Sequence, residues 1–108
     1  MTIFMVETFV VKLDKLGEFM AFHKKFKAWM EKRLDEYKEV KSHKVFSHML
    51  GGNWGGHVVM WEVENLAGLE KFWGRSMQDK EWLTEFRPQL MALIVPGTYS
   101  INIWSPVQ

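Results

Sequence analysis

Residues 41–63 read KSHKVFSHMLGGNWGGHVVMWEV, two alternating segments on either side of a glycine-rich turn. Alternation of apolar and polar residues is typical of strands, and a glycine-rich turn between two strands indicates an antiparallel hairpin. We therefore expect strands at 41–50 and 57–63, joined by a turn at 51–56. This hairpin is the centre of the expected fold, because further elements lie on both sides of it.

The segment before the hairpin predicts a strand followed by a long helix. Residues 2–12 are apolar on both alternating sets, so this strand is expected to be buried on both faces. Asp14 is a candidate cap for a helix at 16–34, where apolar residues recur every three or four positions and the opposite side carries both signs of charge. His23 lies on the apolar stripe of that helix.

The segment after the hairpin predicts a helical region in two pieces. Asn65 is a candidate cap for a helix at 66–73, and residues 74–78 interrupt this helix. Asp79 can cap a second piece. Pro88 lacks a backbone N–H donor, so we expect a kink or break of the helix beside it.

A last alternating segment, 98–104, follows a Pro96-Gly97 turn. The order is then strand, helix, strand, strand, helix, strand. This order predicts an α+β fold, a ferredoxin-like βαββαβ sandwich in which the helices cover one face of a four-stranded antiparallel sheet. With 108 residues, the chain has room for a single domain, 1–108.

The uncovered face of such a sheet predicts an assembly. Both alternating sets of the first and third strands are apolar, so a monomer would expose a larger apolar patch than monomers usually tolerate. A two-fold homodimer, with sheet packed against sheet, would bury that patch. We expect Ile101 to lie in this interface.

Composition excludes several classes of partner. The net charge is +1, with both signs mixed along the chain, so the electrostatic footprint of a nucleic-acid or membrane-surface protein is absent. No stretch is as long and apolar as a membrane span, and the N-terminal residues do not resemble a signal peptide. The chain has no cysteine, which is consistent with a cytoplasmic location.

Two further binding motifs in the hairpin are disfavoured by their context. The glycines of 51–56 could cradle a phosphate, but a strand follows them where a cradle needs a helix N-terminus, so a hairpin turn is favoured. His43 and His48 are five positions apart in one strand and point to opposite faces, and His48 with His57 makes only two ligands. No metal site is expected.

Three short runs carry a resemblance to a known family. These are Trp61-Glu62-Val63-Glu64-Asn65-Leu66-Ala67-Gly68-Leu69, Asp79-Lys80-Glu81-Trp82 and Pro96-Gly97-Thr98-Tyr99. With the order of elements, they resemble the dimeric α+β barrel superfamily, in particular its NIPSNAP-like and antibiotic-biosynthesis-monooxygenase-like branches. The resemblance implies a homodimer in which each subunit has a cleft between sheet and helices for a small apolar or aromatic molecule. Some such relatives are cofactor-free monooxygenases, some degrade haem, and many have no known activity.

The haem-degrading branch fits poorly. Its members resemble one another in an Asn on the first strand and in a Trp and a His on the second helical region. Trp73 could match the Trp, but the first strand offers Glu7 and Thr8 in place of Asn, and Phe86 stands near the expected position of His. Without that histidine the chain has no evident axial ligand for iron. We expect no cofactor.

Polar and aromatic residues within the apolar elements are the candidates for a site. His23 and Glu7 are candidate general bases, since burial perturbs the pKa of such groups. His23 could equally be a core histidine bonded to a backbone carbonyl, and Glu7 could close the rim of the sheet or bond across the dimer seam. The candidate ligand-binding residues are Trp61, Trp73, Tyr99, His48 and Asn102, although aromatic residues at such spacings are more often simple core.

The sequence leaves two functions open. The first is a dimeric module that binds a small apolar or aromatic molecule in the cleft between sheet and helices. The second is a cofactor-independent monooxygenase, or another small enzyme that acts on an aromatic or quinol-type substrate. The first is favoured, because the sequence has no base and orienting partner at a fixed spacing, and fold alone does not decide.

Overall fold

The computed structural model describes residues 2–48 and 54–107. The elements follow one another as β1 (Ile3–Val10), η1 (Leu13–Lys15), α1 (Leu16–Glu31), β2 (Val40–Ser47), β3 (Gly56–Val63), α2 (Leu66–Ser76), η2 (Trp82–Phe86), α3 (Arg87–Leu93) and β4 (Ser100–Trp104). The expected order of strands and helices is confirmed. Residues 51–53 of the turn expected at 51–56 lie outside the described residues.

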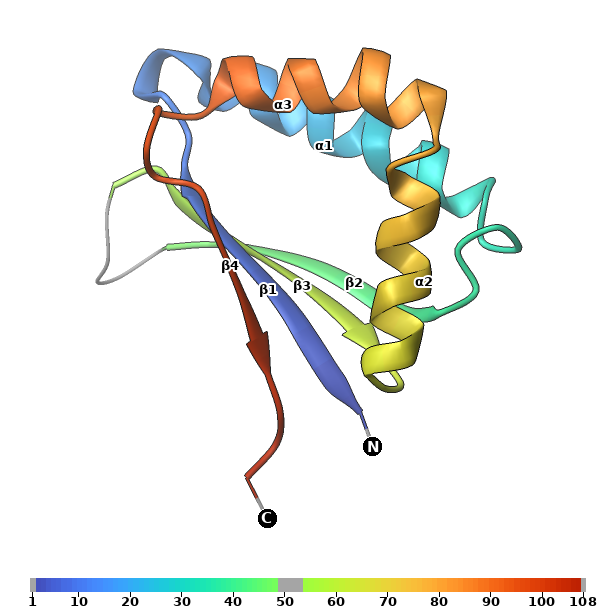
Figure 1. Cartoon of the computed structure of the whole chain (residues 1–108). Helices are drawn as coiled ribbons and strands as arrows, with labels where there is room; N and C mark the ends of the chain where they lie inside the picture. Colours follow the sequence, from blue (N-terminus) through green and yellow to red (C-terminus); the bar gives the residue numbers. More distant parts are fainter. Residues whose placement is uncertain (1, 49–53, 108) are drawn as a thin grey trace.

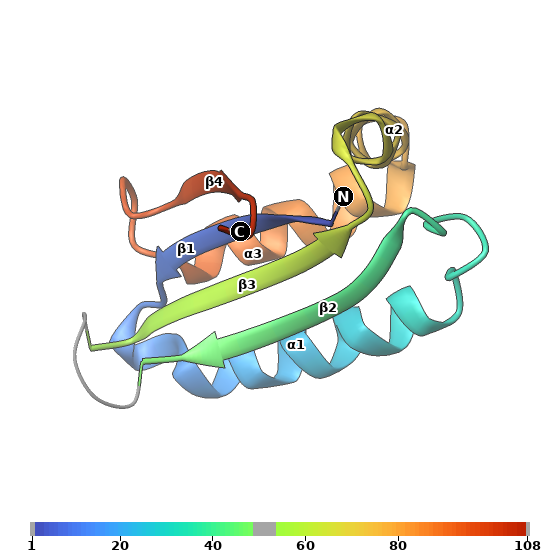
Figure 2. The ribbon, with the colours of Figure 1, turned by 90° about the horizontal axis from the view of Figure 1, so that it is seen from below.

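The four strands form one sheet in the order β2-β3-β1-β4. Each neighbouring pair is antiparallel. This is the expected ferredoxin-like α+β arrangement. Helices α1 and α3 run side by side over one face of the sheet, and α2 crosses near the end of β3 (Figure 1). Seen from the opposite side, the strands have no helix in front of them (Figure 2).

Alternation along β1 assigns residues to the two faces of the sheet. Met5 pairs with Trp61 and Glu7 pairs with Val59, and these side chains face the helices. Their neighbours face the open side, which carries Phe4, Val6, Val10, Val58 and Met60 from the two central strands. Both apolar sets of β1 are therefore accounted for, one by the core and one by the open face.

Ile101 is not on the open face, contrary to expectation. It pairs with Glu7 across the β1–β4 ladder, so its side chain shares the helix-facing side with that residue. Ile101 is 46% exposed, because β4 is an edge strand that the helices cover incompletely. An interface through the open face would instead use residues such as Val58 and Met60.

Three caps were predicted for the helices, and two of them are confirmed. The Asn65 side chain accepts a hydrogen bond from Gly68 N at 2.9 Å, and the Asp79 side chain accepts one from Trp82 N at 3.2 Å. The expected cap at Asp14 is wrong, because that residue lies within η1 and α1 starts without a side-chain cap. Helix α1 also ends earlier than expected, at Glu31, and turns fill most of the chain before β2.

The second helical region is broken, as predicted. Helix α2 ends at Ser76, and η2, a π-helical turn, leads directly into α3 with Pro88 in its first turn. The interruption lies at residues 77–79, whereas ahead of Pro88 the helical backbone continues as a π-helical turn, so the irregularity expected beside the proline is a widened turn and not a break.

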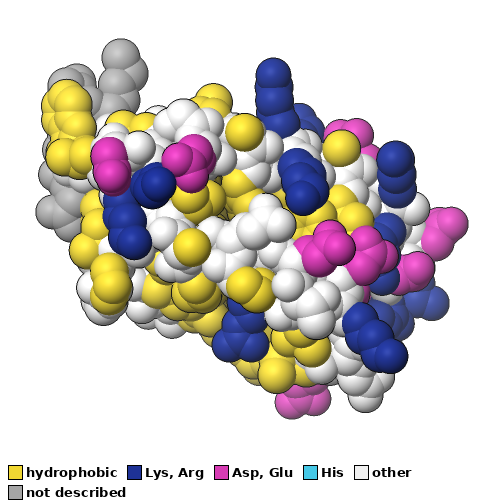
Figure 3. Space-filling model, turned by 90° about the horizontal axis from the view of Figure 1, so that it is seen from above, with side chains coloured by type: hydrophobic (Ala, Val, Ile, Leu, Met, Phe, Trp, Pro, Cys, Tyr) yellow, Lys and Arg dark blue, Asp and Glu magenta, His cyan; other side chains and the backbone are white. Residues whose placement is uncertain are grey.

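The outer side of the helices carries mixed charge (Figure 3). Lys and Arg side chains are interspersed with Asp and Glu side chains over this side. None of the described helices is long and apolar enough to cross a membrane.

Candidate functional site

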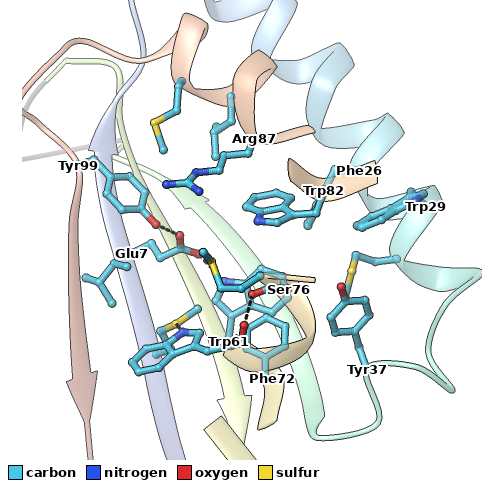
Figure 4. Close-up of a pocket in the computed structure, with 17 residues that line it drawn as sticks. Glu7, Phe26, Trp29, Tyr37, Trp61, Phe72, Ser76, Trp82, Arg87 and Tyr99 are labelled. Carbon is cyan, nitrogen blue, oxygen red and sulfur yellow. Dashed lines mark hydrogen bonds between the residues drawn. The ribbon is translucent and has the colours of Figure 1, made fainter. Parts of the chain in front are cut away.

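A cavity of about 210 Å³ lies between the helix-facing side of the sheet and the three helices (Figure 4). Strands β1, β3 and β4 form its floor, α1 and α2 form its walls, and η2 and α3 close it from above. Aromatic side chains dominate its lining: Phe26, Trp29, Tyr37, Trp61, Phe72, Trp73, Trp82 and Tyr99. The cavity is open at one side, where the exposed residues Met77, Arg87, Met91 and Ile101 line it.

Among the residues that the structure describes, Glu7 is the one acidic residue that lines this cavity. Trp61 Nε1–H donates a hydrogen bond to its Oε1 at 2.5 Å, and the Tyr99 hydroxyl donates one to its Oε2. Burial raises the pKa of Glu7, and the hydrogen bonds from Tyr99 and Trp61 offset this rise only in part. Burial, and then the charge of Glu7, raises the pKa of Tyr99. The two donors fix the carboxyl group while leaving lone pairs for a further donor.

The fold therefore brings together four of the candidates that the sequence suggested. Glu7, Trp61 and Tyr99 form the hydrogen-bonded cluster, and Trp73 lines the same cavity from α2. Trp73 Nε1–H points to the sulfur of Met5, at 3.0 Å, so its indole is fixed against β1. Trp61, Trp73 and Tyr99 are thus held in fixed positions beside an open cavity, as is typical of residues that line a ligand site.

His23 lies beside a second, smaller cavity of about 40 Å³. Glu7 and Trp61 line both cavities, whereas His23 and His43 line only the small one. Burial, and then the charge of Lys27, lowers the pKa of His23, and burial lowers the pKa of His43 to about 4. Both imidazoles are thus neutral at neutral pH, which is compatible with proton transfer but also with simple packing.

The remaining two candidates lie elsewhere. His48 is exposed after the end of β2, and its backbone N–H donates to Gly56 O at 2.8 Å. Asn102 is exposed and pairs with Val6, which places it on the open side of the sheet. Neither borders the two cavities. Among residues 2–48 and 54–107, no group of three or more His, Asp or Glu side chains could hold a metal ion.

Sequence reasoning missed a buried cluster that supports the cavity wall. Tyr37 lines the cavity, and its hydroxyl donates to Asp79 Oδ2 at 2.5 Å. Arg33 Nη1 lies 2.7 Å from the same oxygen, and its guanidinium stacks 4.5 Å from the centre of the Trp29 ring. Trp29 Nε1–H donates to Glu81 Oε2 at 3.1 Å. The Asp79-Lys80-Glu81-Trp82 run is thus a packing motif that holds two aromatic side chains of the cavity wall, Tyr37 and Trp29.

Arg87 was also missed as a lining residue. It is the first residue of α3 and is exposed at the open side of the cavity. Its charge acts on Tyr99, where it lowers the pKa and so opposes the larger effects of burial and Glu7. The sequence signal next to Arg87 was the kink or break expected beside Pro88, and this signal concerned the backbone and not the Arg87 side chain.

Comparison with solved structures identifies relatives of this architecture. A NIPSNAP family protein of unknown function from Agrobacterium tumefaciens superposes with a TM-score of 0.73 at 20% identity, over 99% of this chain and 89% of that one. A second NIPSNAP family protein from the same organism gives a TM-score of 0.74 at 17% identity, over 99% and 94%. The chain has the fold of the NIPSNAP proteins. An antibiotic biosynthesis monooxygenase is also similar, with a TM-score of 0.68 at 10% identity, over 98% and 99%.

The NIPSNAP fold is shared at low sequence identity, so the comparison concerns architecture and not activity. No family model matches the chain, and no curated protein matches it. The resemblance seen in the sequence is thereby supported at the level of the fold. Function has to be argued from the cavity itself.

Proposed function

We propose that this protein binds a small apolar or aromatic molecule that carries at least one hydrogen-bond donor. The observation behind the proposal is the Glu7 carboxyl group, which is fixed by two donors at the floor of an aromatic cavity. Ligand sites are typically concave and apolar, with a few fixed polar groups that orient the ligand. A ligand hydroxyl or amine would use the lone pairs that Trp61 and Tyr99 leave free.

The cavity volume limits the size of this ligand. About 210 Å³ is below the roughly 300–1,000 Å³ of sites for drug-sized molecules. A compact aromatic such as 1-naphthol, with about 11 heavy atoms at about 0.6 kcal/mol each, would bind with a Kd in the tens of micromolar.

A titration of tryptophan fluorescence with 1-naphthol tests the proposal, because Trp29, Trp61, Trp73 and Trp82 line the cavity. We expect saturable binding that Ser76→Phe abolishes, since Ser76 lines the cavity and a ring there would fill it. Ala67→Phe is the matched control, because it adds the same ring to an exposed position of the same helix away from the cavity. Equal loss of binding in both variants, or no saturable binding at all, would contradict the proposal.

The second candidate function is a cofactor-independent monooxygenase acting on a quinol-type substrate. It is favoured by the raised pKa of Glu7, because a carboxylate held in a nonpolar environment is a stronger base than one in water. Glu7 would take the hydroxyl proton of the bound quinol, and Tyr99 would orient the carboxylate. The test is the rate of oxygen consumption with 1,4-dihydroxynaphthalene as substrate. Enzymatic turnover should fall at least about a hundredfold in Glu7→Gln. The same assay on His23→Ala shows whether His23, the other candidate base, is needed.

We also propose a homodimer formed through the open face of the sheet. The support is the apolar character of that face, where Phe46 is 48% and Trp104 is 51% exposed beside the central strands. Val58→Asp should dissociate the dimer in sedimentation experiments, since it would bury an unpaired carboxylate. Leu66→Asp is the control, because Leu66 is an exposed residue of α2 and not of a strand. A wild-type monomer would overturn this proposal and leave the cavity unaffected.

A cytoplasmic location remains part of the proposal. It rests on the absence of cysteine from the chain, which suits a reducing compartment. Fractionation of cells that express the chain with a C-terminal epitope tag tests it, and recovery with the membrane or secreted fraction would contradict it.

A further inference from the structure

The cavity contains an acidic group that has no ion-pair partner among the described residues. Within residues 2–48 and 54–107, no ion pair involves Glu7, although four other pairs join Lys or Arg to carboxylates. Its two hydrogen-bond donors, Trp61 and Tyr99, are both neutral groups. A carboxylate removed from water is stabilised most by an opposite charge placed beside it.

The surroundings of Glu7 are suited to one particular kind of cation. Aromatic rings from β3, α1, α2 and η2 enclose the cavity around the carboxyl group, with Trp61, Phe72 and Trp82 among them (Figure 4). Aromatic rings attract a weakly hydrated cation such as an alkylammonium, and cages of such rings recognise quaternary ammonium groups. A strongly hydrated metal ion would find too few oxygen ligands among the described residues here.

From this charge complementarity we infer that the ligand of the cavity carries a cationic amine or ammonium group, which the aromatic rings surround and the Glu7 carboxylate neutralises. The inference rests on the proposed small-molecule site and names the chemical class of its ligand. Arg87 at the open side is a counteracting charge. It favours entry with the apolar part of the ligand nearest the opening and the cation at the floor.

Two probes of equal shape test the inference: phenyltrimethylammonium and tert-butylbenzene, which differ in a central nitrogen or carbon and hence in charge. Both are titrated against wild type, Glu7→Gln and Arg87→Gln, with tryptophan fluorescence as the readout. We expect Glu7→Gln to weaken phenyltrimethylammonium about tenfold and to leave tert-butylbenzene within about twofold. Arg87→Gln should strengthen only the cationic probe, because it removes a like charge.

The outcomes separate this inference from the proposed function. If both probes bind and neither variant changes their ratio, or if only tert-butylbenzene binds, the cavity is a binding site but the cationic class is wrong. If neither probe binds wild type while 1-naphthol does, the inference fails and the proposed site stands, and if 1-naphthol does not bind either, both fail. Near-UV circular dichroism checks that Glu7→Gln is folded, and Arg87→Gln, a change at an exposed residue, tests the charge preference independently.

Discussion

Asp79 and Glu7 are two carboxyl groups withdrawn from water, and each accepts a hydrogen bond from a tyrosine hydroxyl. Asp79 also has Arg33, 2.7 Å away, whereas Glu7 has a second neutral donor in Trp61. Burial alone would raise the pKa of Asp79, but the hydrogen bonds from Tyr37 and Arg33 outweigh it, so that pKa is lowered. For Glu7 burial prevails and the pKa is raised.

The comparison shows how a cationic partner changes the role of a carboxyl group that is withdrawn from water. With Arg33 present, the Asp79 charge contributes to holding the end of α1, the following turns and the start of the last helical piece together. Without a cation, the Glu7 charge is costly to the folded state and is available to a ligand or a proton. Asp79 is thus expected to matter for stability and Glu7 for binding. Substitutions can test that division, and the largest effect is expected at Asp79.

Asp79→Asn should lower the free energy of unfolding by about 2–3 kcal/mol, because the buried Asp79 side chain loses its ion pair with Arg33, while Arg33 keeps Glu36 as a partner. Urea denaturation followed by circular dichroism measures the change. Asp35→Asn is a control, since Asp35 is an exposed aspartate in the turns that carry Arg33, and its loss should cost less than about 0.5 kcal/mol. Equal, small effects of the two variants would show that Asp79 does not stabilise the fold.

The two tyrosines give a smaller and asymmetric effect. Tyr37→Phe removes a hydrogen bond to a charged, buried carboxylate and should cost about 1.5–2 kcal/mol. Tyr99→Phe should cost less than about 1 kcal/mol, since protonation of Glu7 relieves the loss of a donor. The same urea experiment measures both. A larger cost for Tyr99→Phe than for Tyr37→Phe would contradict the division in which Asp79 serves stability and Glu7 serves binding.

Glu7→Gln is expected to leave stability unchanged or to raise it by up to about 1 kcal/mol. The substitution removes a charge that burial opposes and keeps a carbonyl oxygen for one of the two donors. A gain in thermal stability with a loss of ligand affinity would be the pattern of a functional site. A loss of several kcal/mol would instead place Glu7 with Asp79 as a structural group.

Much of the fold follows from local pattern, but the partners of these carboxylates do not. Alternation identifies Glu7 as a polar residue in an apolar strand, yet its bond to Tyr99 depends on how β1 pairs with β4. The same register places Asn102 on the open side and Ile101 beside Glu7. The sequence had predicted the reverse, with Asn102 in the ligand site and Ile101 in the dimer interface. Such register cannot be read from either strand alone, since a shift by one residue exchanges the faces.

Irregular backbone hid the other missing residues. Tyr37 lies in turns between α1 and β2, where no period predicts burial. Arg87 follows the π-helical turn of η2, which departs from the 3.6-residue period, so the helical pattern before it does not predict where Arg87 points. Short irregular elements therefore supplied Tyr37 and led into Arg87, and they gave little sequence signal.

The smallest effect concerns the dependence of stability on pH. A raised folded-state pKa means that Glu7 contributes stability in its protonated form, fully present below its ordinary value of 4.5 and lost as pH rises through the folded-state pKa. Asp79 has the opposite sign: its contribution is present above its ordinary value of 3.8 and is lost as pH falls through the lowered folded-state pKa.

Urea titrations of wild type and Glu7→Gln across pH separate the two contributions. The variant should gain stability relative to wild type as pH rises above the ordinary glutamate pKa of 4.5, while both lose stability in acid because both keep Asp79. Tyr99, Arg87, His23 and His43 line the cavities around Glu7 and are common to the two proteins, so the difference between the two titrations reports on the Glu7 carboxyl group. A difference that is flat with pH would mean that Glu7 titrates normally in the folded protein. In that case the carboxylate is well solvated, and the contrast with Asp79 would rest on Arg33 alone.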